Sequence, residues 1–465
     1  MSKSTQRHRI VVIGGGPGGY EAALAGSQLG AEVVLIEESG IGGNAVLTDV
    51  VPSKSLIAVS DAAEDLTKLE ALGVNLGGNS ATIDISNVNQ KLLALAHEQS
   101  EDMQSALESA GVRVVRGRGQ LDGNHLVAVT NVDGSAGERI ETRTIVVATG
   151  ASPRELENAK PDGRRILNWK QLYSLESIPE HLIVVGSGVT GAEFASAYLA
   201  LGSEVTLVSS REQLLPGQDE DAARLLEKEF ERRGMRILKQ SRATAANATD
   251  SGVQVHLEGG VVLEGTHCLM AVGSVPNTAN LGLEDARVEL TESGHIRVNK
   301  VAGTSRANVY AVGDCTDFMP LASVAAMQGR TAVFHAMGDI ANPVQARNIA
   351  SNVFTAPEIA SVGWQESAIV SGEVRGNSYR VELAANPRAK MMGINSGFIK
   401  LMASSSGTVV GGLVVAPKAS ELILPIAIAV ENRLTVDQLA RTFAVYPSLS
   451  GSISDAARAL HQPID

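Results

Sequence analysis

Two glycine-rich segments of this chain have the residue types and spacing of a phosphate-binding turn. Each follows an apolar run of strand length and repeats the pattern Gly-x-Gly-x-x-Gly before a helix-forming stretch. The first glycine makes a tight turn, the second lets the backbone approach a pyrophosphate, and the third lets helix and strand pack closely. The glycines are Gly14, Gly16 and Gly19 in the first segment and Gly186, Gly188 and Gly191 in the second. Because a helix N-terminus adds amide donors, the two segments predict two bound dinucleotides, which suggests FAD plus a nicotinamide nucleotide.

The residue at the end of the second strand distinguishes the two sites. Glu37 follows Gly19 by 18 residues, where a carboxylate can accept hydrogen bonds from ribose hydroxyls. The same offset in the second segment leads to Ser209, which is followed by Ser210 and Arg211. A carboxylate there would repel a 2′-phosphate, whereas hydroxyls and a guanidinium can bind it. We therefore predict FAD at the first site and a second site that favours NADPH. A solvated loop charge is the equally weighted alternative for Arg211.

Both segments lie within strand–turn–helix–strand units, which a nucleotide site of this kind requires. The expected strands are 9–13, 33–36, 182–185 and 205–208, and the expected helices are 20–29 and 192–201. Two such units place the chain in the α/β class.

The segment from Gly40 to Lys54 resembles the redox-active segment of the pyridine nucleotide-disulfide reductases, the family of glutathione reductase and lipoamide dehydrogenase. That segment has the pattern G-G-T-C-x-N-x-G-C-x-P-S-K, and the positions in register here are Gly42, Gly43, Pro52, Ser53 and Lys54. The two cysteine positions hold Ala45 and Val50, whose side chains cannot form a thiolate. The resemblance therefore implies the family's scaffold without its disulfide chemistry.

Five further motifs follow in the family's order. They are Val147–Gly150, Ala271–Asn277 with Ser274 in place of the usual arginine, Tyr310–Asp314, Leu321–Arg330 and Val353–Gly363. The resemblance runs from about residue 9 to 455. It implies two Rossmann-like domains, for FAD and for NAD(P), plus an α+β C-terminal dimerisation domain. The implied domains are FAD-binding at 1–150 and 272–343, NAD(P)-binding at 151–271, and dimerisation at 344–465.

The family's C-terminal proton-transfer pair is also missing. In the family, the pattern H-P-T-x-S-E reaches the flavin of the partner subunit, where the histidine shuttles a proton and the glutamate orients it. Tyr446 and Gly451 stand at these two positions, and His461 beyond them is interpreted as a solvated tail residue. The joint loss of both cysteines, the base and its partner indicates a branch with another electron acceptor. A catalytically inactive protein is the alternative.

Two groups of the family's flavin site are kept. Lys54 ends the P-S-K pattern that places a lysine near the flavin, and Glu193 stands at the position of its ion-pair partner. A cation beside the isoalloxazine stabilises a reduced, anionic flavin. An exposed lysine at a helix start and a favourable charge in a first helical turn are the structural alternatives.

The resemblance implies a set of cofactor-binding residues spread over both sites and no metal ligand. The set is Gly14, Gly16, Gly19, Glu37, Glu38, Gly43, Asn44, Lys54, Gly119, Thr149, Gly150, Ala151, Asp314, Leu321, Ala322, Gly186, Gly188, Gly191, Glu193, Ser209, Ser210, Arg211 and Gly273.

Composition and charge exclude several classes of partner. The 465 residues are 44% apolar with a net charge of −12, and the absence of basic runs argues against nucleic acid and anionic membranes. No apolar stretch approaches the roughly 20 residues that span a bilayer. We interpret Cys268 and Cys315 as buried apolar residues. They fit a reducing cytoplasm, and the polar stretch 1–9 shows no signal peptide, so we expect a cytoplasmic protein.

These features predict a homodimeric FAD flavoprotein that oxidises NADPH or NADH and passes two electrons directly to a quinone, without disulfide reductase activity. Loss of two sulfurs and an imidazole leaves an apolar space beside the flavin, lined by Ala45, Val50 and Tyr446 of the partner subunit, which suits a flat quinone. The chain resembles the cysteine-less NAD(P)H:quinone reductase branch of the family. The alternatives are a soluble pyridine nucleotide transhydrogenase or diaphorase and an inactive flavin-binding protein. The apolar stretch 422–430 is expected at the dimer interface.

Overall fold

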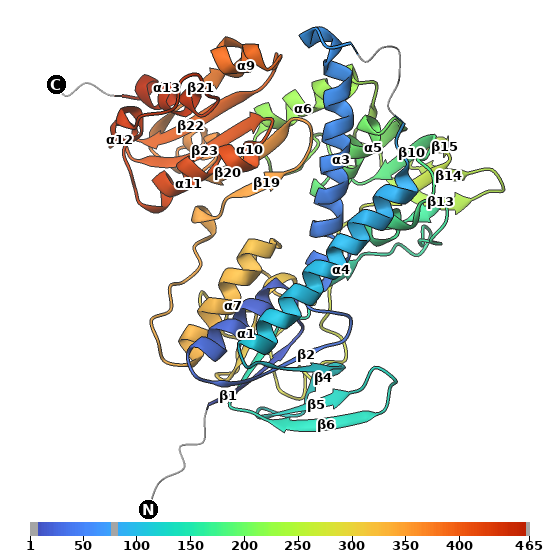
Figure 1. The fold of residues 1–465 in the computed structure, drawn as a ribbon, viewed down its shortest axis with the longest axis vertical. Helices are drawn as coiled ribbons and strands as arrows, with labels where there is room; N and C mark the ends of the chain where they lie inside the picture. The colour runs from blue at the N-terminus through green and yellow to red at the C-terminus, as the bar shows by residue number, and fades with distance from the viewer. Residues whose placement is uncertain (1–7, 76–81, 462–465) are drawn as a thin grey trace, which may run out of the picture. The chain divides into compact units, whose positions relative to one another are not determined.

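The computed structural model describes residues 8–75 and 82–461, and the chain divides into two compact units (Figure 1). The first unit comprises 1–55, 89–154 and 273–345, and the second comprises 56–88, 155–272 and 346–465. Most of the stretch in which we sought a signal peptide lies outside the described residues. Two long helices, α3 (Val50–Lys68) and α4 (Ile85–Ser109), contribute residues to both units.

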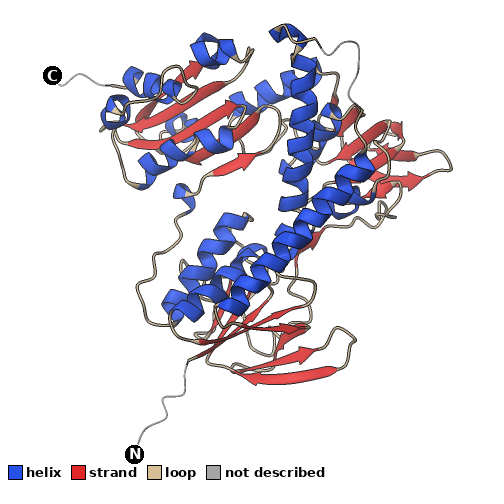
Figure 2. Ribbon diagram, in the orientation of Figure 1, coloured by secondary structure: helices blue, strands red, loops and turns tan. Residues whose placement is uncertain are grey.

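A five-stranded parallel sheet with the order β18-β7-β1-β2-β3 forms the centre of the first unit (Figure 2). Its strands are β1 (Arg9–Ile13), β2 (Glu32–Glu37), β3 (Arg113–Arg116), β7 (Thr144–Val147) and β18 (Val309–Ala311). On β1, Ile10 and Val12 pack with the helices of one face, while Val11 and Ile13 pack with strands on the other. Burial on both faces explains why this strand is a continuous apolar run rather than an alternating one.

Two neighbouring helices, α1 (Pro17–Gln28) and α7 (Ala322–Ala336), cover one face of this sheet. They can approach closely because Gly329 has no side chain. A Cβ at this position would lie 2.1 Å from the carbonyl oxygen of Gly18. The other face carries an antiparallel sheet of three strands. The remaining elements are β4 (Arg118–Leu121), β5 (Leu126–Thr130), β6 (Ala136–Glu141), β8 (Ala151–Pro153), β17 (Ser274–Pro276), α2 (Gly43–Leu47) and η3 (Gly313–Cys315).

The second unit repeats this architecture with a parallel sheet of order β12-β11-β10-β16-β9 and an antiparallel sheet β13-β14-β15. The strands are β9 (Ile166–Leu167), β10 (His181–Val185), β11 (Glu204–Val208), β12 (Arg236–Leu238), β13 (Ala243–Ala248), β14 (Val253–Leu257), β15 (Val262–Gly265) and β16 (His267–Met270). The helices are α5 (Val189–Ala200), α6 (Glu220–Arg232) and η2 (Trp169–Ser174).

The four strands expected from the sequence are present, but the two helices begin earlier than expected. Helix α1 begins at Pro17 rather than Tyr20, and α5 begins at Val189 rather than Ala192. The difference arises because the third glycine of each pattern lies inside the helix rather than before it.

Residues 346–465, called here the interface domain, complete the second unit. Their antiparallel sheet has the order β19-β20-β23-β22-β21. The strands are β19 (Ser351–Val353), β20 (Glu358–Gly363), β21 (Gly376–Glu382), β22 (Phe398–Ser404) and β23 (Val409–Ala416). The helices are α8 (Glu366–Val370), α9 (Pro387–Met391), α10 (Ala419–Leu422), α11 (Leu424–Glu431), α12 (Val436–Arg441), α13 (Gly451–Ala459), η4 (Ala346–Asn348) and η5 (Leu383–Ala385).

Residues 56–88, which we expected in the FAD-binding domain, group with the second unit. They include the end of α3 and the short helix η1 (Glu70–Leu72) that follows it. One physical reason is an ion pair. Glu64 of α3 pairs with Arg233 at 2.9 Å, and the two side chains are 16% and 11% exposed.

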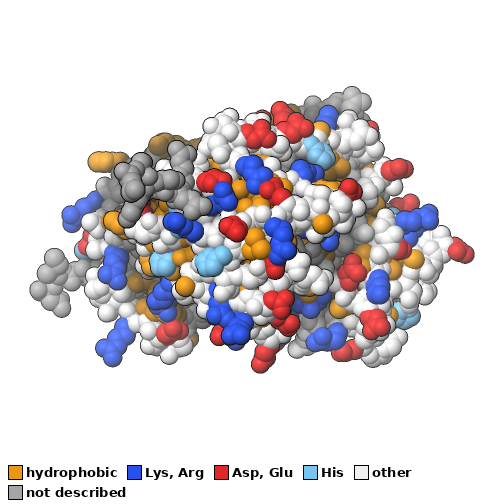
Figure 3. All heavy atoms as spheres, turned by 90° about the horizontal axis from the view of Figure 1, so that it is seen from below, with side chains coloured by type: hydrophobic (Ala, Val, Ile, Leu, Met, Phe, Trp, Pro, Cys, Tyr) orange, Lys and Arg blue, Asp and Glu red, His pale blue; other side chains and the backbone are white. Residues whose placement is uncertain are grey.

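The surface carries both signs of charge. Figure 3 shows acidic and basic side chains interspersed over one face, with no large patch of a single sign. Within 8–75 and 82–461, no helix is long and apolar enough to cross a membrane. The same residues hold no group of three or more His, Cys, Asp or Glu side chains placed to bind a metal ion.

Candidate functional site

The first glycine-rich turn has the geometry that a pyrophosphate needs. Gly14 has a φ of +101°, and a Cβ there would lie 2.4 Å from the carbonyl oxygen of Ala148. A Cβ on Gly19 would lie 1.9 Å from the carbonyl oxygen of Gly14, so helix and turn can pack only around a glycine. A Cβ on Gly16 would meet nothing within 4 Å. The middle glycine thus opens onto free space at the N-terminus of α1.

The second turn repeats this geometry position by position. Gly186 has a φ of +115°, and a Cβ there would lie 2.1 Å from the carbonyl oxygen of Ala271. A Cβ on Gly191 would lie 1.9 Å from the carbonyl oxygen of Gly186, while one on Gly188 would meet nothing within 4 Å. Neither α1 nor α5 has a side-chain cap at its N-cap glycine. Since these helix starts are open to an anion, both sites fit a dinucleotide.

The carboxylate of Glu37 is held beneath the first turn. One oxygen accepts the Gly15 N–H at 2.6 Å, and the other accepts the Ser39 N–H at 2.7 Å. The side chain is 9% exposed, so it orders the turn at the end of β2. Its neighbour Glu38 is half-buried and pairs with Arg118 at 2.7 Å.

The second site replaces this carboxylate with a pair of serines. The hydroxyls of Ser187 and Ser209 lie 2.7 Å apart, and Ser209 also accepts the Arg211 N–H at 3.1 Å. Ser209 is fully buried, whereas Ser210 and Arg211 are exposed. Of the three residues predicted to favour NADPH, only the last two therefore face solvent. The sequence signal for the serine pair is that Ser187 occupies the position of Gly15.

Two motifs that are far apart in sequence meet beside the first turn. The Asn277 side chain donates to the Thr149 carbonyl at 2.9 Å, and the Thr149 hydroxyl donates to the Asn277 carbonyl at 2.7 Å. The Asn44 side chain donates to the Ala151 carbonyl at 2.7 Å. Gly150, with a φ of +67°, has open space where a Cβ would lie. The structure thus brings these predicted cofactor residues together.

The glycines around the turn have distinct reasons to be glycine. Gly43 has a φ of +53°, and a Cβ there would lie 3.1 Å from the Cα of Gly16. A Cβ on Gly119 would lie 3.0 Å from the Ile13 side chain, so this position is explained by packing on the sheet. Gly273 has a φ of +93° with open space around it.

Asp314 lies in η3, and its half-buried carboxyl has a raised pKa because burial disfavours the charged form, while nearby His295 opposes this shift. Sequence reasoning missed a residue that fixes this segment: the side chain of Gln328 on α7 accepts the Gly313 N–H at 2.8 Å. Leu321 is the N-cap residue of α7 and Ala322 is its first residue, as the family motif implied.

The segment that lacks the cysteines forms two helices. Ala45 lies on α2, and Val50 begins α3 with 36% of its surface exposed. Lys54 follows in the next turn of α3 and belongs to the first unit, whereas Glu193 belongs to the second. Their ion pair remains a prediction.

Glu193 has a partner that the sequence did not reveal. Its side chain is 4% exposed and accepts the backbone N–H of Phe354 at 2.8 Å. Three residues along α5, the hydroxyl of Ser196 accepts the Ala356 N–H at 3.1 Å. Glu193 is thus a buried link between α5 and the turn between β19 and β20.

Tyr446 is 82% exposed in this chain, and its neighbours Phe443 and Val445 are 102% and 78% exposed. Gly451, at the other replaced position, begins α13. His461 is exposed and pairs with Asp437 at 2.6 Å, so the tail residue has a partner on α12.

The two cysteines are buried and free, as expected. Burial raises the pKa of Cys268 to about 12 and also raises the pKa of Cys315. Neither thiol therefore has the ionisation or the access that a redox role requires.

This chain is similar to known proteins over nearly its whole length. Residues 8–329 match the pyridine nucleotide-disulphide oxidoreductases, and residues 349–457 match the dimerisation domain of that family. The chain is 49% identical to the NAD(P)H dehydrogenase (quinone) of Mycobacterium tuberculosis over 98% of its own length and 95% of the relative's. It is 32% identical to dihydrolipoyl dehydrogenase 2 of Haloarcula marismortui, over 97% and 96% of the two chains. The crystal structure of LpdA from Mycobacterium tuberculosis matches with a TM-score of 0.94 and 48% identity, over 98% of this chain and 100% of that one.

Proposed function

Because this chain belongs to the pyridine nucleotide-disulphide oxidoreductase family, we propose that it passes two electrons from NAD(P)H through FAD directly to a quinone. It is a flavin-dependent NAD(P)H oxidoreductase, and FAD and a nicotinamide nucleotide are its cofactors. When bound, FAD supplies a two-electron carrier between the nicotinamide and the acceptor. The balanced reaction consumes NAD(P)H, one proton and a quinone, and yields NAD(P)+ and the hydroquinone.

One observation carries the choice of acceptor. Ala45 and Val50 stand where the family has its two redox-active cysteines, so this segment offers no thiol to receive the electrons. Apolar side chains in their place suit the ring of a quinone better than a polar disulfide substrate. The similar protein named NAD(P)H dehydrogenase (quinone) supports this choice, since the likeness extends over nearly all of both chains.

The proposal gives each site residue a role. The turns at Gly16 and Gly188 bind the two pyrophosphates through backbone amides. Lys54 stabilises negative charge on the flavin side of the reaction, and Glu193 positions it. Tyr446 of the partner subunit donates a hydrogen bond to a quinone oxygen that gathers negative charge.

NADPH is the proposed electron donor because of the loop after β11. Ser210 and the guanidinium of Arg211 are exposed there, and no carboxylate occupies the position of Glu37. A guanidinium binds a phosphate through parallel charged hydrogen bonds. The preference is thus assigned to Arg211, with Ser210 as a second donor.

A homodimer follows from the proposed role of Tyr446. Residues 349–457 match the family's dimerisation domain, and α11 exposes 60% of Leu424 and 48% of Ile428. Exposed aliphatic side chains that gather on one helix are typical of a surface that another protein covers. We place this dimer in the cytoplasm.

We retain the layout of an FAD domain at 1–150 and 272–343, an NAD(P) domain at 151–271 and a dimerisation domain at 344–465.

The test separates electron donor from electron acceptor. The protein is reduced anaerobically with NADPH and then mixed in a stopped-flow instrument with quinones, lipoamide, glutathione disulfide or oxidised pyridine nucleotide. We expect fast reoxidation by quinones and none by the disulfides. Reoxidation by a pyridine nucleotide alone would indicate a transhydrogenase, and a flavin that NADPH cannot reduce would indicate an inactive flavin-binding protein.

A further inference from the structure

The loop between β11 and α6, residues 209–218, is here called the recognition loop because it carries Ser210 and Arg211. Hydrogen bonds within the nucleotide-binding part fix it along its length. The Leu215 N–H donates to the Ser187 carbonyl at 2.9 Å, and the Leu214 N–H donates to the Glu227 carboxylate at 3.0 Å. The Gln213 side chain donates to the Gln218 carbonyl at 3.1 Å. These hydrogen bonds hold the middle of the loop in place between Ser210 and Arg211 at one end and Gly217 at the other.

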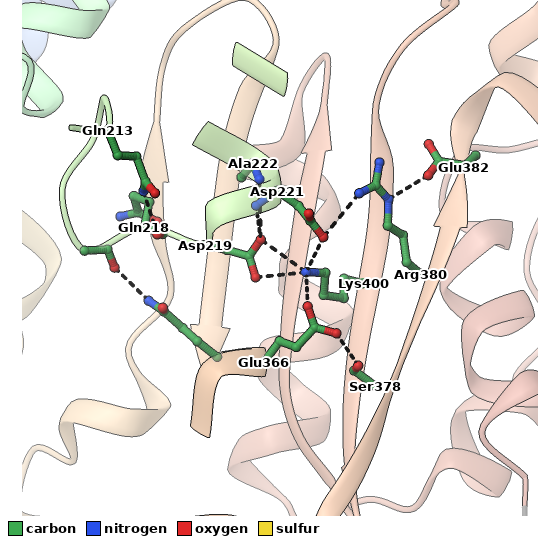
Figure 4. A network of polar contacts seen from close by, with 12 residues as sticks. Gln213, Gln218, Asp219, Asp221, Ala222, Glu366, Ser378, Arg380, Glu382 and Lys400 are labelled. Carbon is green, nitrogen blue, oxygen red and sulfur yellow. Dashed lines mark hydrogen bonds and ion pairs between the residues drawn. The ribbon is translucent and has the colours of Figure 1, made fainter. Parts of the chain in front are cut away.

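The interface domain holds the far end of the recognition loop (Figure 4). The side chain of Gln365 donates to the Gly217 carbonyl at 3.0 Å. The ammonium group of Lys400 on β22 lies 3.0 Å from the carboxylate of Asp219, the residue that follows the loop and caps α6. The ion pair of Lys400 with Asp219 therefore joins the sheet of the interface domain to the start of α6.

The surroundings of Lys400 make this junction rigid. Lys400 is 1% exposed, and its ammonium group also lies 2.8 Å from Asp221 and 2.5 Å from Glu366. Burial opposes the charged ammonium, but the carboxylates outweigh it and raise the pKa of Lys400. A buried ion network of this kind costs desolvation energy, so it is weak evidence of stabilisation and better evidence of a fixed geometry.

A second cation completes the cluster. Arg380 on β21 lies 3.2 Å from Asp221 and 2.6 Å from Glu382, and its guanidinium stacks 3.9 Å above the Phe398 ring. Lys400 and Arg380, on the adjacent strands β22 and β21, thus both bind carboxylates at the start of α6.

We propose that Lys400 and Gln365 are positioning residues for the nicotinamide nucleotide, because they anchor the recognition loop that presents Ser210 and Arg211. The inference rests on the proposed function, since it assigns NADPH to the second site. The alternative is a junction that contributes to folding stability and has no effect on nucleotide affinity.

The chain offers a matched control at the opposite end of α6. Arg233 follows that helix, pairs with Glu64 at 2.9 Å and donates to the Ala356 carbonyl at 3.3 Å. It thus links α6 to the interface domain by a half-buried charge without contacting the recognition loop. Arg233→Met tests the effect of a weakened junction alone.

The experiment compares Lys400→Met, Gln365→Ala and Arg233→Met as full-length holoenzymes. For Gln365→Ala we expect the apparent Kd of NADPH in flavin reduction to rise about threefold, and for Lys400→Met about tenfold, with an almost unchanged limiting rate. Amide hydrogen exchange in 209–218 should accelerate in both variants before NADPH is added. Arg233→Met should lower the melting temperature but leave both readouts unchanged.

Two results would overturn the inference. One is a Gln365→Ala variant with wild-type exchange in 209–218 and wild-type NADPH affinity, which decides the matter even if Lys400→Met does not fold. The other is an equal rise in Kd in Arg233→Met. If NADPH fails to reduce the wild-type flavin, the proposed function fails, whereas the exchange measurement still tests the anchoring of the loop.

Discussion

The hydroxyls of Ser187 and Ser209 lie 2.7 Å apart beneath the second glycine-rich turn, at the positions that Gly15 and Glu37 occupy in the first. In the first turn a carboxylate accepts a backbone N–H, and in the second a neutral hydroxyl pair takes its place. The second turn is therefore held without a negative charge. A phosphate on the ribose can approach this turn without repulsion from a carboxylate.

This arrangement makes Arg211 the test of nucleotide preference. We expect Arg211→Gln to raise the Kd of NADPH by roughly tenfold or more, the value of one charged hydrogen bond of about 1.5–3 kcal/mol, and to leave NADH affinity nearly unchanged. Stopped-flow flavin reduction at several concentrations of each nucleotide measures both values. Arg242→Gln is the control, because Arg242 is also an exposed arginine, and it pairs with Glu258 on the same nucleotide-binding part. Equal losses for NADPH and NADH would contradict the assignment.

Thiol reagents should leave the enzyme active. Cys268 and Cys315 are fully buried, and a pKa of about 12 keeps the Cys268 thiol protonated at neutral pH. Quinone reduction after incubation with iodoacetamide is the measurement, and a reduced dihydrolipoyl dehydrogenase treated in parallel is the positive control. Complete inactivation would show that one of these cysteines acts in the reaction.

The reverse substitution tests how much of the thiol machinery is missing. Restoring both cysteines, with Ala45→Cys and Val50→Cys, should still give no efficient disulfide reductase. The reason is that Tyr446 and Gly451 also replace the proton-transfer pair. Lipoamide and glutathione disulfide reduction by the double variant provides the check, and efficient turnover of either substrate would contradict the explanation.

The nucleotide sites could be predicted from sequence because their geometry is local. Gly14 and Gly186 adopt positive φ, and a Cβ on Gly19 or Gly191 would lie 1.9 Å from a carbonyl oxygen, so glycine is required at these positions. Each requirement appears in the sequence as a glycine at a fixed spacing. The same holds for the buried strands, whose apolar runs reflect burial on both faces.

The charged junction at Lys400 could not be predicted in the same way. Lys400 interrupts the apolar strand β22, and its partner Asp219 lies 181 residues away. Sequence alone shows an isolated lysine in a strand, which more often points to solvent. The link from Glu193 to the Phe354 N–H was hidden for a related reason, since a backbone donor leaves no mark on residue type.

Acid should weaken the junction around Lys400. Hydrogen bonding to Lys400 lowers the pKa of Asp221, and the pKa of Glu366 is lowered by Lys400 and Ser378 against the opposing effect of burial. Their ordinary values are 3.8 and 4.5. A lowered folded-state pKa stabilises the fold above the ordinary value, and this contribution is lost as pH falls through the folded-state value. Glu366→Gln should therefore show a smaller loss of melting temperature between pH 5 and pH 3, within roughly the window where these carboxyls titrate.

A matched variant gives the control for this pH effect. Glu373→Gln removes a carboxylate that pairs with Arg347 at 3.8 Å, and both of those side chains are about 60% exposed. Because exposed pairs contribute little, its melting temperature should follow the wild-type pH dependence. Parallel curves for wild type and Glu366→Gln would show that the Lys400 junction does not contribute to acid sensitivity.

Tyr446 gives the sharpest test of the proposed acceptor. Tyr446 is 82% exposed in one chain and follows the exposed residues Phe443 and Val445, which suits a residue that a partner subunit covers. If its hydroxyl donates to a quinone oxygen, Tyr446→Phe should leave flavin reduction by NADPH unchanged. Reoxidation by quinone should slow by ~10-fold, the value of one hydrogen bond of about 1.4 kcal/mol in a transition state. Stopped-flow measurement of the two half-reactions separates these effects.

The control and the contrary outcomes for this substitution are distinct. Tyr379 on β21 is another tyrosine with an exposed side, since 46% of the residue's surface is exposed. Tyr379→Phe removes its hydroxyl and should change neither half-reaction. Wild-type reoxidation in Tyr446→Phe would mean that the ring only packs. Only a group near the reacting quinone oxygen can alter the second half-reaction alone. A change confined to the NADPH step would therefore assign Tyr446 to the nicotinamide site instead.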